Sequence, residues 1–432
     1  MKRKIESALL DWKSREGRRP LLIRGARQVG KTYTALKFGK EHYRSTVYFN
    51  FEGAREAVSI FERDLDPDRI VRELSALSGQ SILPEDTLII FDEIQACEKA
   101  LTSLKYFCEK APQYPVIAAG SLLGVALNRE KFSFPVGKVD ALTLYPLDFE
   151  EFLWATGNEA LCELIHEAYD SFSPLTLHER AMDLYKLYLA VGGMPRPVME
   201  YIDHRDFDFV MDAQRTLADA YIADMAKYAE PQETVRVMAA WNSIPAQLAK
   251  ENRKFQYRLI RSGARAHQYE AALTWLEMAG IINRCFHVRE GRMPLSAYRE
   301  QEAFKIYMMD TGILRSKFEI APNVILNTPH GFDGFKGALA ENYIMQALIS
   351  NGFSPCYWTS QGRAEVDFIL QDSCGNVIPL EAKSAENVRS KSLKTFFSKY
   401  DVPYALRVSG RNFGNENDIR SVPLYAVFCL KP

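Results

Sequence analysis

Apolar and polar residues follow each other along the first third of the chain in a pattern that predicts a layered α/β fold. Four short apolar runs, typical of buried strands, are separated by longer stretches in which apolar residues recur at helical spacing. The runs lie at Leu21–Arg24, Thr46–Phe51, Leu88–Phe91 and Val116–Ala119. Strands that alternate with helices form a parallel sheet covered on both faces, and ligands bind at the carboxyl ends of its strands. We therefore expect an α/β core with a ligand site in residues 1–146.

The pattern changes after this core. Residues 147–230 show helical periodicity, begin with a run of carboxylates, and are interrupted at Gly192-Gly193-Met194-Pro195. Glycine and proline so close together break a helix. We expect this segment to be a lid of helices whose acidic residues form a solvated face.

Residues 231–318 match the pattern of a winged helix. Helices are expected at Trp241–Lys250, Tyr257–Arg261 and Arg265–Ala279, followed by a two-stranded wing over Ile281–Tyr298. A local positive bias comes from Arg253, Lys254, Arg258, Arg261, Arg265 and His267. These residues indicate either contact with DNA phosphates, with the third helix in a groove, or the solvated basic face of a module that docks within the chain.

The turn after the first strand carries the most specific motif. Gly25-Ala-Arg-Gln-Val-Gly30-Lys31-Thr32 matches the phosphate-binding loop G-x-x-x-x-G-K-[ST] at every fixed position. The glycines let successive N–H groups point at phosphates, and the helix that follows presents its positive end. Lys31 is predicted to reach the β- and γ-phosphates of ATP, and Thr32 to bind Mg²⁺. The predicted nucleotide-binding residues of this loop are Gly25, Ala26, Arg27, Gln28, Val29, Gly30, Lys31, Thr32 and Tyr33.

Two further strands end in polar residues that suit the same chemistry. Leu88–Phe91 is followed by Asp92, predicted to hold Mg²⁺, and by Glu93, predicted to polarise the water that attacks the γ-phosphate. Val116–Ala119 is followed by Gly120 and Ser121. Ser121 is either a sensor of the γ-phosphate or part of a simple strand-to-loop turn. Together these residues predict binding of ATP and Mg²⁺.

Composition narrows the classes of protein to consider. The chain has 432 residues, 47% of them hydrophobic, and a net charge of −1, so any nucleic-acid contact must be local. No apolar run is long enough to span a membrane, which predicts a soluble, cytoplasmic protein with no membrane partner. The seven cysteines form no C-x-x-C pair, a pattern that argues against zinc and favours reduced thiols.

The segment 330–432 carries a second candidate site. A helix that includes Glu341 is followed by a strand with Asp367, a turn, and a return strand with Glu381 and Lys383. This order is the PD-(D/E)xK pattern of nucleases, and period-2 geometry places the last two residues on one face beside Asp367. Asp367 and Glu381, with Glu341 as a further acid, are predicted to chelate Mg²⁺, and Lys383 to orient water against a phosphodiester. An inactive domain of the same fold is the alternative.

With these motifs in place, the chain resembles the large prokaryotic family of AAA+-type ATP-binding proteins that end in a nuclease-like domain of unknown function. The resemblance also rests on residues 143–152, 193–195, 304–312 and 365–367, and it covers nearly the whole chain. It implies ATP hydrolysis, a lid, a winged helix and a PD-(D/E)xK-type fold, but no biological substrate. Gly137-Lys138 departs from the expected glycine-arginine, which leaves Arg129 and Arg196 as alternative arginine fingers.

The sequence thus predicts an ATP-hydrolysing protein with a P-loop core (1–146), a helical lid (147–230), a winged helix (231–318) and a nuclease-like domain (330–432). Its expected ligands are ATP and Mg²⁺, and its expected partners are DNA and further copies of the chain. The alternative is an ATP-driven switch that regulates a protein partner, with a catalytically inactive C-terminal domain. Both alternatives use the same nucleotide site.

Overall fold

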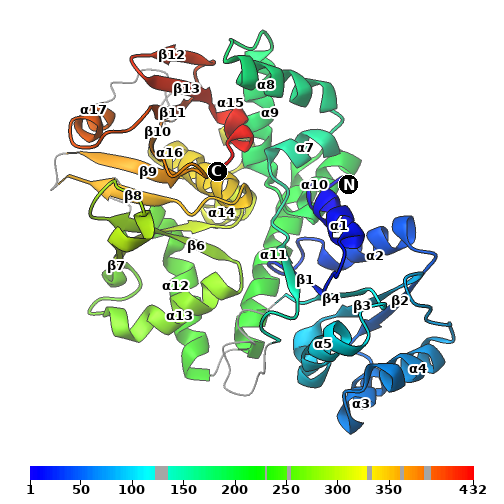
Figure 1. Cartoon of the computed structure of the whole chain (residues 1–432). Helices are drawn as coiled ribbons and strands as arrows, with labels where there is room; N and C mark the ends of the chain where they lie inside the picture. Colours follow the sequence, from blue (N-terminus) through cyan, green and yellow to red (C-terminus); the bar gives the residue numbers. More distant parts are fainter. Residues whose placement is uncertain (122–134, 229–230, 251–253, 328–332, 361–363, 384–390) are drawn as a thin grey trace. The chain divides into compact units, whose positions relative to one another are not determined.

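The computed structural model (Figure 1) describes residues 1–121, 135–228, 231–250, 254–327, 333–360, 364–383 and 391–432. Its contacts divide the chain into two compact units. The N-terminal unit consists of Lys2–Tyr145 with Met278–Gly280, and the C-terminal unit consists of Pro146–Glu277 and Ile281–Pro432 with Met1. The division of the chain into four domains stays a prediction.

The N-terminal unit has the expected alternation of strands and helices. In chain order its elements are α1 (Ile5–Ser14), β1 (Leu21–Arg24), α2 (Lys31–His42), β2 (Ser45–Asn50), α3 (Arg55–Arg63), α4 (Pro67–Ser78), β3 (Thr87–Asp92), the 3-10 turn η1 (Ile94–Ala96), α5 (Glu98–Lys110), β4 (Val116–Ala119) and β5 (Asp140–Thr143).

These strands form one parallel sheet in the order β2-β3-β4-β1-β5. The four predicted strands are present, and the sequence pattern missed β5. Residues of β5 alternate between half-buried and exposed, so this edge strand forms no continuous apolar run. Because all strands are parallel, the carboxyl ends of β1, β3 and β4 meet at one edge of the sheet, where the predicted ligand residues follow.

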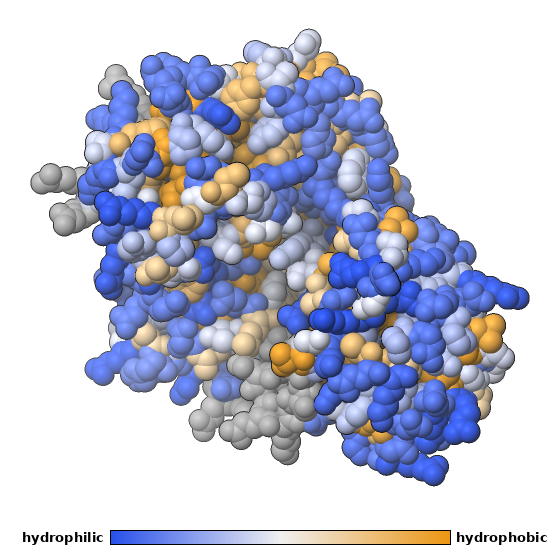
Figure 2. All heavy atoms as spheres, viewed as in Figure 1, coloured by the Kyte–Doolittle hydropathy of each residue, from blue (hydrophilic) through white to orange (hydrophobic). Residues whose placement is uncertain are grey.

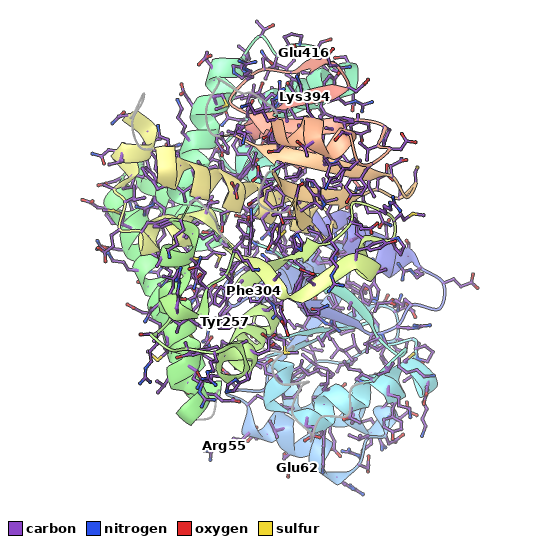
Figure 3. All side chains as sticks on the ribbon, turned by 90° about the vertical axis from the view of Figure 1, so that its left-hand side faces the viewer. Arg55, Glu62, Tyr257, Phe304, Lys394 and Glu416 are labelled. Atoms are coloured by element: carbon purple, nitrogen blue, oxygen red, sulfur yellow. The ribbon has the colours of Figure 1, made fainter. Side chains whose placement is uncertain are left out.

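Helices cover both faces of this sheet. On one face α3, α4 and α5 pack around Phe91, whose ring contacts Phe51, Phe61 and Phe107. On the other face lies α2, which approaches so closely at Gly39 that a Cβ there would stand 2.4 Å from the Thr46 hydroxyl oxygen. Arg55 and Glu62, near the two ends of α3, are labelled in Figure 3.

The C-terminal unit contains more elements. They are α7 (Phe149–Ala155), α8 (Glu159–Ser171), α9 (His178–Val191), α10 (Pro195–His204), α11 (Phe207–Tyr228), α12 (Pro231–Leu248), η2 (Tyr257–Leu259), α13 (Ala266–Met278, of which Met278 belongs to the N-terminal unit), β6 (Ile282–Val288), η3 (Leu295–Tyr298), β7 (Arg299–Met308), α14 (Thr311–Lys317), α15 (Pro322–Asn327), α16 (Asp333–Ser350), β8 (Cys356–Thr359), β9 (Glu365–Gln371), β10 (Val377–Ala382), α17 (Lys391–Phe397), β11 (Ala405–Ser409), β12 (Gly414–Glu416), β13 (Ile419–Pro423) and η4 (Leu424–Cys429).

One mixed sheet of eight strands organises this unit, in the order β12-β13-β11-β10-β9-β8-β6-β7. It joins strands from the predicted winged helix with strands from the predicted nuclease-like domain, because β6 pairs with β7 on one side and with β8 on the other. The boundary predicted between residues 318 and 330 therefore does not separate two sheets.

The elements of the predicted winged helix differ from those expected. The return strand β7 covers Arg299–Met308 and not the end of Ile281–Tyr298, because its pairing with β6 runs from Arg299 opposite Val288 to Met308 opposite Ile282. The expected first helix is the end of the longer α12, and the expected second helix is the single turn η2. Tyr257 of η2 and Phe304 of β7, both labelled in Figure 3, each lie 5.1 Å from the Phe255 ring, centroid to centroid.

The surface facing the viewer in Figure 2 is mostly hydrophilic, with scattered hydrophobic residues. Among the helices that the structure describes, none is long and apolar enough to cross a membrane.

Candidate functional site

The loop between β1 and α2 has the backbone that a phosphate cradle requires. Gly25 has φ +143°, and a Cβ there would lie 2.1 Å from the Leu144 carbonyl oxygen, so no other residue fits. Gly30, with φ 99°, precedes the first residue of α2. Gln28 also has a positive φ, 64°, which glycine spacing alone did not indicate. The loop thus ends at a helix N-terminus, where backbone N–H groups can receive phosphate oxygens.

Lys31 lies across this loop. Its ammonium group donates hydrogen bonds to the carbonyl oxygens of Gly25, at 3.0 Å, and Ala26, at 2.8 Å, and only 6% of the residue is exposed. A buried ammonium that is held by loop carbonyls is positioned for anions that enter the loop. Tyr33, the last predicted loop residue, is by contrast 58% exposed.

Asp92, at the carboxyl end of β3, receives two hydroxyl groups on one carboxylate oxygen. Thr32 Oγ1 donates to Asp92 Oδ2 at 2.8 Å, and the Tyr48 hydroxyl donates to the same atom at 2.7 Å. Burial and the bond to Asp92 raise the pKa of Tyr48 to about 12, so it remains a donor at neutral pH. The structure therefore brings together Thr32 and Asp92, the two oxygen ligands predicted for Mg²⁺ in this unit.

Glu93 lies in a second small network. It has a left-handed backbone, with φ 48°, and its Oε2 accepts hydrogen bonds from Gln95 Nε2 at 2.5 Å and Ser121 Oγ at 3.2 Å. Its own N–H donates to Asp92 Oδ1 at 3.0 Å. Ser121, at the end of β4, thus contacts the residue predicted to polarise water, which a simple strand-to-loop turn would not require.

Three residues of this site were missed in the sequence. Tyr48 could have been found from strand order, because it lies on β2 directly beside β3. Gln95 follows Glu93 by two residues and has no motif of its own. Arg3 is buried and donates to the carbonyl oxygens of Val29 in the loop, at 3.0 Å, and Tyr145, at 2.6 Å. No sequence signal connects it to the loop.

The candidates for an arginine finger have local partners or lie outside the described residues. Lys138 pairs with Glu109 at 2.9 Å within the N-terminal unit. Arg196, in the C-terminal unit, is 3.7 Å from the Glu200 carboxylate. Arg129 lies outside the described residues.

Basic residues of the predicted winged helix are accessible. Arg258, Arg261, Arg265 and His267 are all exposed. Arg258 Nε donates to the Gln256 side chain at 3.0 Å. Arg253 lies outside the described residues. The three arginines are therefore accessible in η2 and in the segment that leads to α13.

The glycine-proline motif at 193–195 is held by a buried carboxylate of the C-terminal unit. Asp310 Oδ2 accepts the Gly193 N–H at 2.6 Å, and Oδ1 accepts the Ile313 N–H at 2.9 Å. Burial raises the pKa of Asp310 to about 6, while these backbone bonds and the nearby Arg315 oppose the increase. Two segments that carried the family resemblance, 193–195 and 304–312, thus meet at one hydrogen-bonded contact.

The predicted C-terminal site is assembled in part. Asp367 on β9 and Glu381 on β10 come from paired antiparallel strands, and Lys383 Nζ lies 3.2 Å from Glu381 Oε1. Glu381 is 2% exposed, and its Oε2 has no hydrogen-bond partner among the described residues. The shared face of Glu381 and Lys383 is thus as the strand period predicts.

The two other carboxylates of that site each accept a hydrogen bond from the protein. Asp367 Oδ2 accepts the Ala382 N–H at 2.8 Å, and Glu341 Oε2 accepts the Tyr307 hydroxyl at 3.2 Å. Within the described part of the chain, Glu341, Asp367 and Glu381 do not form a group that could hold one metal ion, whereas Glu150, Cys162 and His166 do.

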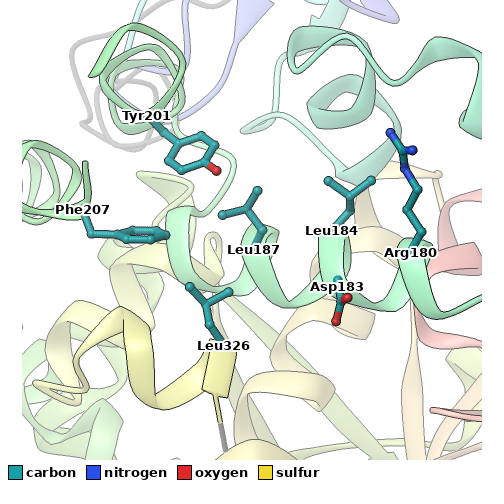
Figure 4. A pocket seen from close by; sticks show the side chains of 7 residues that line it. All are labelled: Arg180, Asp183, Leu184, Leu187, Tyr201, Phe207 and Leu326. Carbon is teal, nitrogen blue, oxygen red and sulfur yellow. The ribbon is translucent and has the colours of Figure 1, made fainter. Parts of the chain in front are cut away.

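A groove of about 540 Å³ on the C-terminal unit was not predicted (Figure 4). It is lined by Arg180, Asp183, Leu184, Leu187, Tyr201, Phe207 and Leu326, from α9, α10, α11 and α15. It contains none of the predicted site residues.

Comparison with protein families gives three matches. Residues 17–153 match an AAA domain, residues 182–323 a domain of unknown function (DUF8612), and residues 336–426 another (DUF4143). The AAA match includes the phosphate loop, Asp92 and Glu93 at the end of β3, and Ser121. A search of curated proteins found no match.

Solved structures with similar chains include a Walker-type ATPase of Pyrococcus abyssi (16% identity, 73% of this chain and 95% of that chain, TM-score 0.45). Others are the Aeropyrum pernix Orc1 protein in complex with DNA (14%, 73% and 90%, 0.31) and the Thermotoga maritima RuvB Holliday junction branch migration motor (17%, 68% and 88%, 0.29). Because these TM-scores are below 0.5, the assignment rests on the AAA match. That match shows that the segment 17–153 is similar to an AAA domain.

Proposed function

We propose that this chain hydrolyses ATP in the N-terminal unit and couples hydrolysis to binding of DNA by the C-terminal unit. The proposal of ATP hydrolysis rests on the hydrogen bond between Thr32 and Asp92. This bond lies next to the phosphate loop, whose carbonyl oxygens accept hydrogen bonds from Lys31. A hydroxyl and a carboxylate from different elements, 2.8 Å apart and next to a phosphate loop, suit the coordination of Mg²⁺ with ATP.

Each residue has a distinct task in this proposal. Backbone N–H groups of the loop and the Lys31 ammonium bind the phosphates and offset their negative charge. Bound Mg²⁺ supplies further positive charge at the phosphate oxygens. Glu93 accepts a proton from the attacking water, and its bonds from Gln95 and Ser121 orient the carboxylate for that transfer.

Two substitutions separate binding from turnover. Lys31→Ala should abolish tight ATP binding, since it removes the cation at the phosphates. Glu93→Gln should keep ATP binding and reduce turnover by about a hundredfold or more, as expected when a positioned base is removed. Lys40→Ala, an exposed lysine of the same helix, is the control and should change neither quantity. Equal loss of binding in both variants would overturn these assignments.

The coupling to DNA is supported by the exposed cations between η2 and α13. Arg258, Arg261 and Arg265 are accessible in a chain with almost no net charge, so a local phosphate contact is the electrostatic use that suits them. DNA should stimulate ATP hydrolysis by the full chain. The triple replacement of these arginines by alanine should weaken DNA binding and reduce its salt dependence by about one unit per lost contact.

A matched variant removes the same charge from the other unit. Arg55, Arg63 and Arg72 are exposed on α3 and α4, and their triple replacement by alanine should leave the salt slope unchanged. If both triple variants have the wild-type slope, the basic segment does not bind DNA.

A second candidate function is an ATP-driven switch that acts on a protein partner. It is favoured by the internal hydrogen bonds of Glu341 and Asp367, which engage the carboxylates that a nuclease would use for metal. This alternative predicts ATP hydrolysis that is indifferent to DNA, and no Mg²⁺- or Mn²⁺-dependent cleavage of linear, nicked or branched DNA. DNA-stimulated hydrolysis in the wild type would exclude it.

A further inference from the structure

We propose that Glu150, Cys162 and His166 form a zinc-binding site in the C-terminal unit. These residues offer one oxygen, one sulfur and one nitrogen atom, all within 4.8 Å of one another. They include none of the residues that we assign to ATP or DNA. The site is independent of the proposed function.

Helix geometry brings the three ligands together. Cys162 and His166 are four residues apart on α8, so their side chains lie on the same face, one turn apart. Glu150 comes from the first turn of α7, a helix whose start is fixed by a capping box between Asp148 and Glu151. Two backbone elements therefore hold the ligand set.

The distances already approach those of a metal centre. Cys162 Sγ lies 3.5 Å from Glu150 Oε1, and His166 Nε2 lies 2.7 Å from the same oxygen. Zinc bonds of about 2.0–2.3 Å place tetrahedral ligand atoms about 3.3–3.7 Å apart. Inserting the ion requires the histidine and the carboxylate to separate by less than about 1 Å, which side-chain rotation provides.

Charge and burial favour a divalent ion of intermediate softness. Glu150 and Cys162 are buried, whereas the His166 side chain is 37% exposed. A carboxylate and a thiolate together neutralise Zn²⁺, so the filled site would bury no net charge. The thiolate selects against Mg²⁺ and Ca²⁺, and the exposed side leaves a fourth position for water.

The surroundings of His166 explain what such a site could do. Its ring packs against Phe428 at 5.3 Å between centroids, and Cys429 Sγ lies 3.7 Å from its other nitrogen, Nδ1. Both residues belong to η4 near the chain end. A metal ion would therefore fix the ring that contacts η4, joining α7 and α8 to this terminal segment. The absence of a C-x-x-C pair in the sequence does not exclude this zinc site, because the ligands of the site are a C-x-x-x-H pair on one helix and a glutamate from another.

Cobalt is the probe, because Co²⁺ occupies zinc sites and a cobalt–thiolate bond absorbs light. All proteins carry Cys374→Ser, which removes an exposed thiol that could bind cobalt by itself. After treatment with a chelator, the full chain should bind one equivalent of Co²⁺ with a thiolate charge-transfer band and visible bands of tetrahedral cobalt. One equivalent of Zn²⁺ should displace the cobalt and raise the melting temperature of the C-terminal unit.

Three variants test the ligand assignment. Cys162→Ser should remove the thiolate band, and His166→Ala, at a half-exposed position that should not impair folding, should weaken Co²⁺ binding at least about tenfold. Cys97→Ser, a buried cysteine of the N-terminal unit, is the control and should keep the band. No thiolate band at stoichiometric Co²⁺ in the parent, or cobalt affinity unchanged by His166→Ala, would overturn the proposal.

Discussion

The contact between Asp310 and the glycine-proline motif predicts a pH dependence of stability. Burial raises the pKa of Asp310 from 3.8 to about 6 in the folded state. A folded protein that binds a proton more tightly than the unfolded chain is stabilised where that proton is bound. The stabilisation is therefore fully present below about pH 4 and is lost as the pH rises through about 6.

The size of this effect follows from the shift. About two pKa units correspond to about 3 kcal/mol of unfolding free energy. Over the experimentally accessible range from about pH 4.5 to pH 7.5, about 2 kcal/mol of this should be lost. Other carboxylates titrate in the same range. The quantity to measure is thus the difference between the wild type and Asp310→Asn, which cannot titrate there.

Urea unfolding at several pH values can measure that difference. Four of the five tryptophans lie in the C-terminal unit, so Trp12→Phe in all proteins makes fluorescence report on this unit alone. Asp310→Asn also weakens the bond to the Gly193 N–H, because an amide NH₂ cannot accept it, but this offset does not depend on pH. The unfolding free energy of the wild type minus that of the variant should fall by about 2 kcal/mol from about pH 4.5 to pH 7.5.

The control for this experiment is Asp183→Asn on α9 of the same unit, where the carboxylate is 73% exposed. Its difference from the wild type should be nearly constant with pH. If the difference in unfolding free energy between the wild type and Asp310→Asn stays flat or grows with pH, the reasoning is refuted. Such a result would mean that the hydrogen bonds to the carboxylate outweigh its burial.

Three further predictions concern single contacts. Tyr48→Phe removes one of the two hydroxyls on Asp92 and should leave ATP affinity nearly unchanged while raising the Mg²⁺ concentration needed for half-maximal hydrolysis; an unchanged Mg²⁺ dependence would contradict this role. Arg3→Ala removes one hydrogen bond to the phosphate loop, at the Val29 carbonyl, and one to the Tyr145 carbonyl, and should weaken ATP binding about tenfold, measured by calorimetry; an unchanged affinity would show that Arg3 does not support the loop. Lys383→Ala leaves the buried Glu381 unpaired and should destabilise the C-terminal unit by about 1–3 kcal/mol in urea, most of which a second substitution, Glu381→Gln, should restore.

The sequence predicted the phosphate loop because all its information is local. Gly25, Gly30, Lys31 and Thr32 lie within eight residues, and the backbone they require depends on the missing Cβ atoms, not on distant partners. The strands of the core were predictable for a similar reason, since buried parallel strands are continuous apolar runs. The edge strand β5 escaped because half of its residues face solvent.

Predictions that depend on distant pairing fared less well. Both strands of the wing were expected within Ile281–Tyr298, but β7 begins at Arg299, because pairing of its buried residues with β6 outweighs the preference for a short hairpin. At the C-terminal site, by contrast, the strand period places Glu381 and Lys383 on one face, as their ion pair requires. The strand period does not predict hydrogen bonds, and so it did not reveal that the Asp367 carboxylate accepts the Ala382 N–H.

The contact between Ser121 and Glu93 connects two of the predicted roles in the N-terminal unit. A sensor that touched only the γ-phosphate would affect ATP binding, whereas Ser121 donates to the carboxylate that we propose as the base. Because both Ser121 and Gln95 bond to Oε2, either one alone can hold the carboxylate in place. Removing one should therefore cost little turnover, and removing both should cost more than the sum of the single effects, as for any pair that acts on one group. Simple additivity of Gln95→Ala and Ser121→Ala would show that Glu93 is oriented by its own backbone.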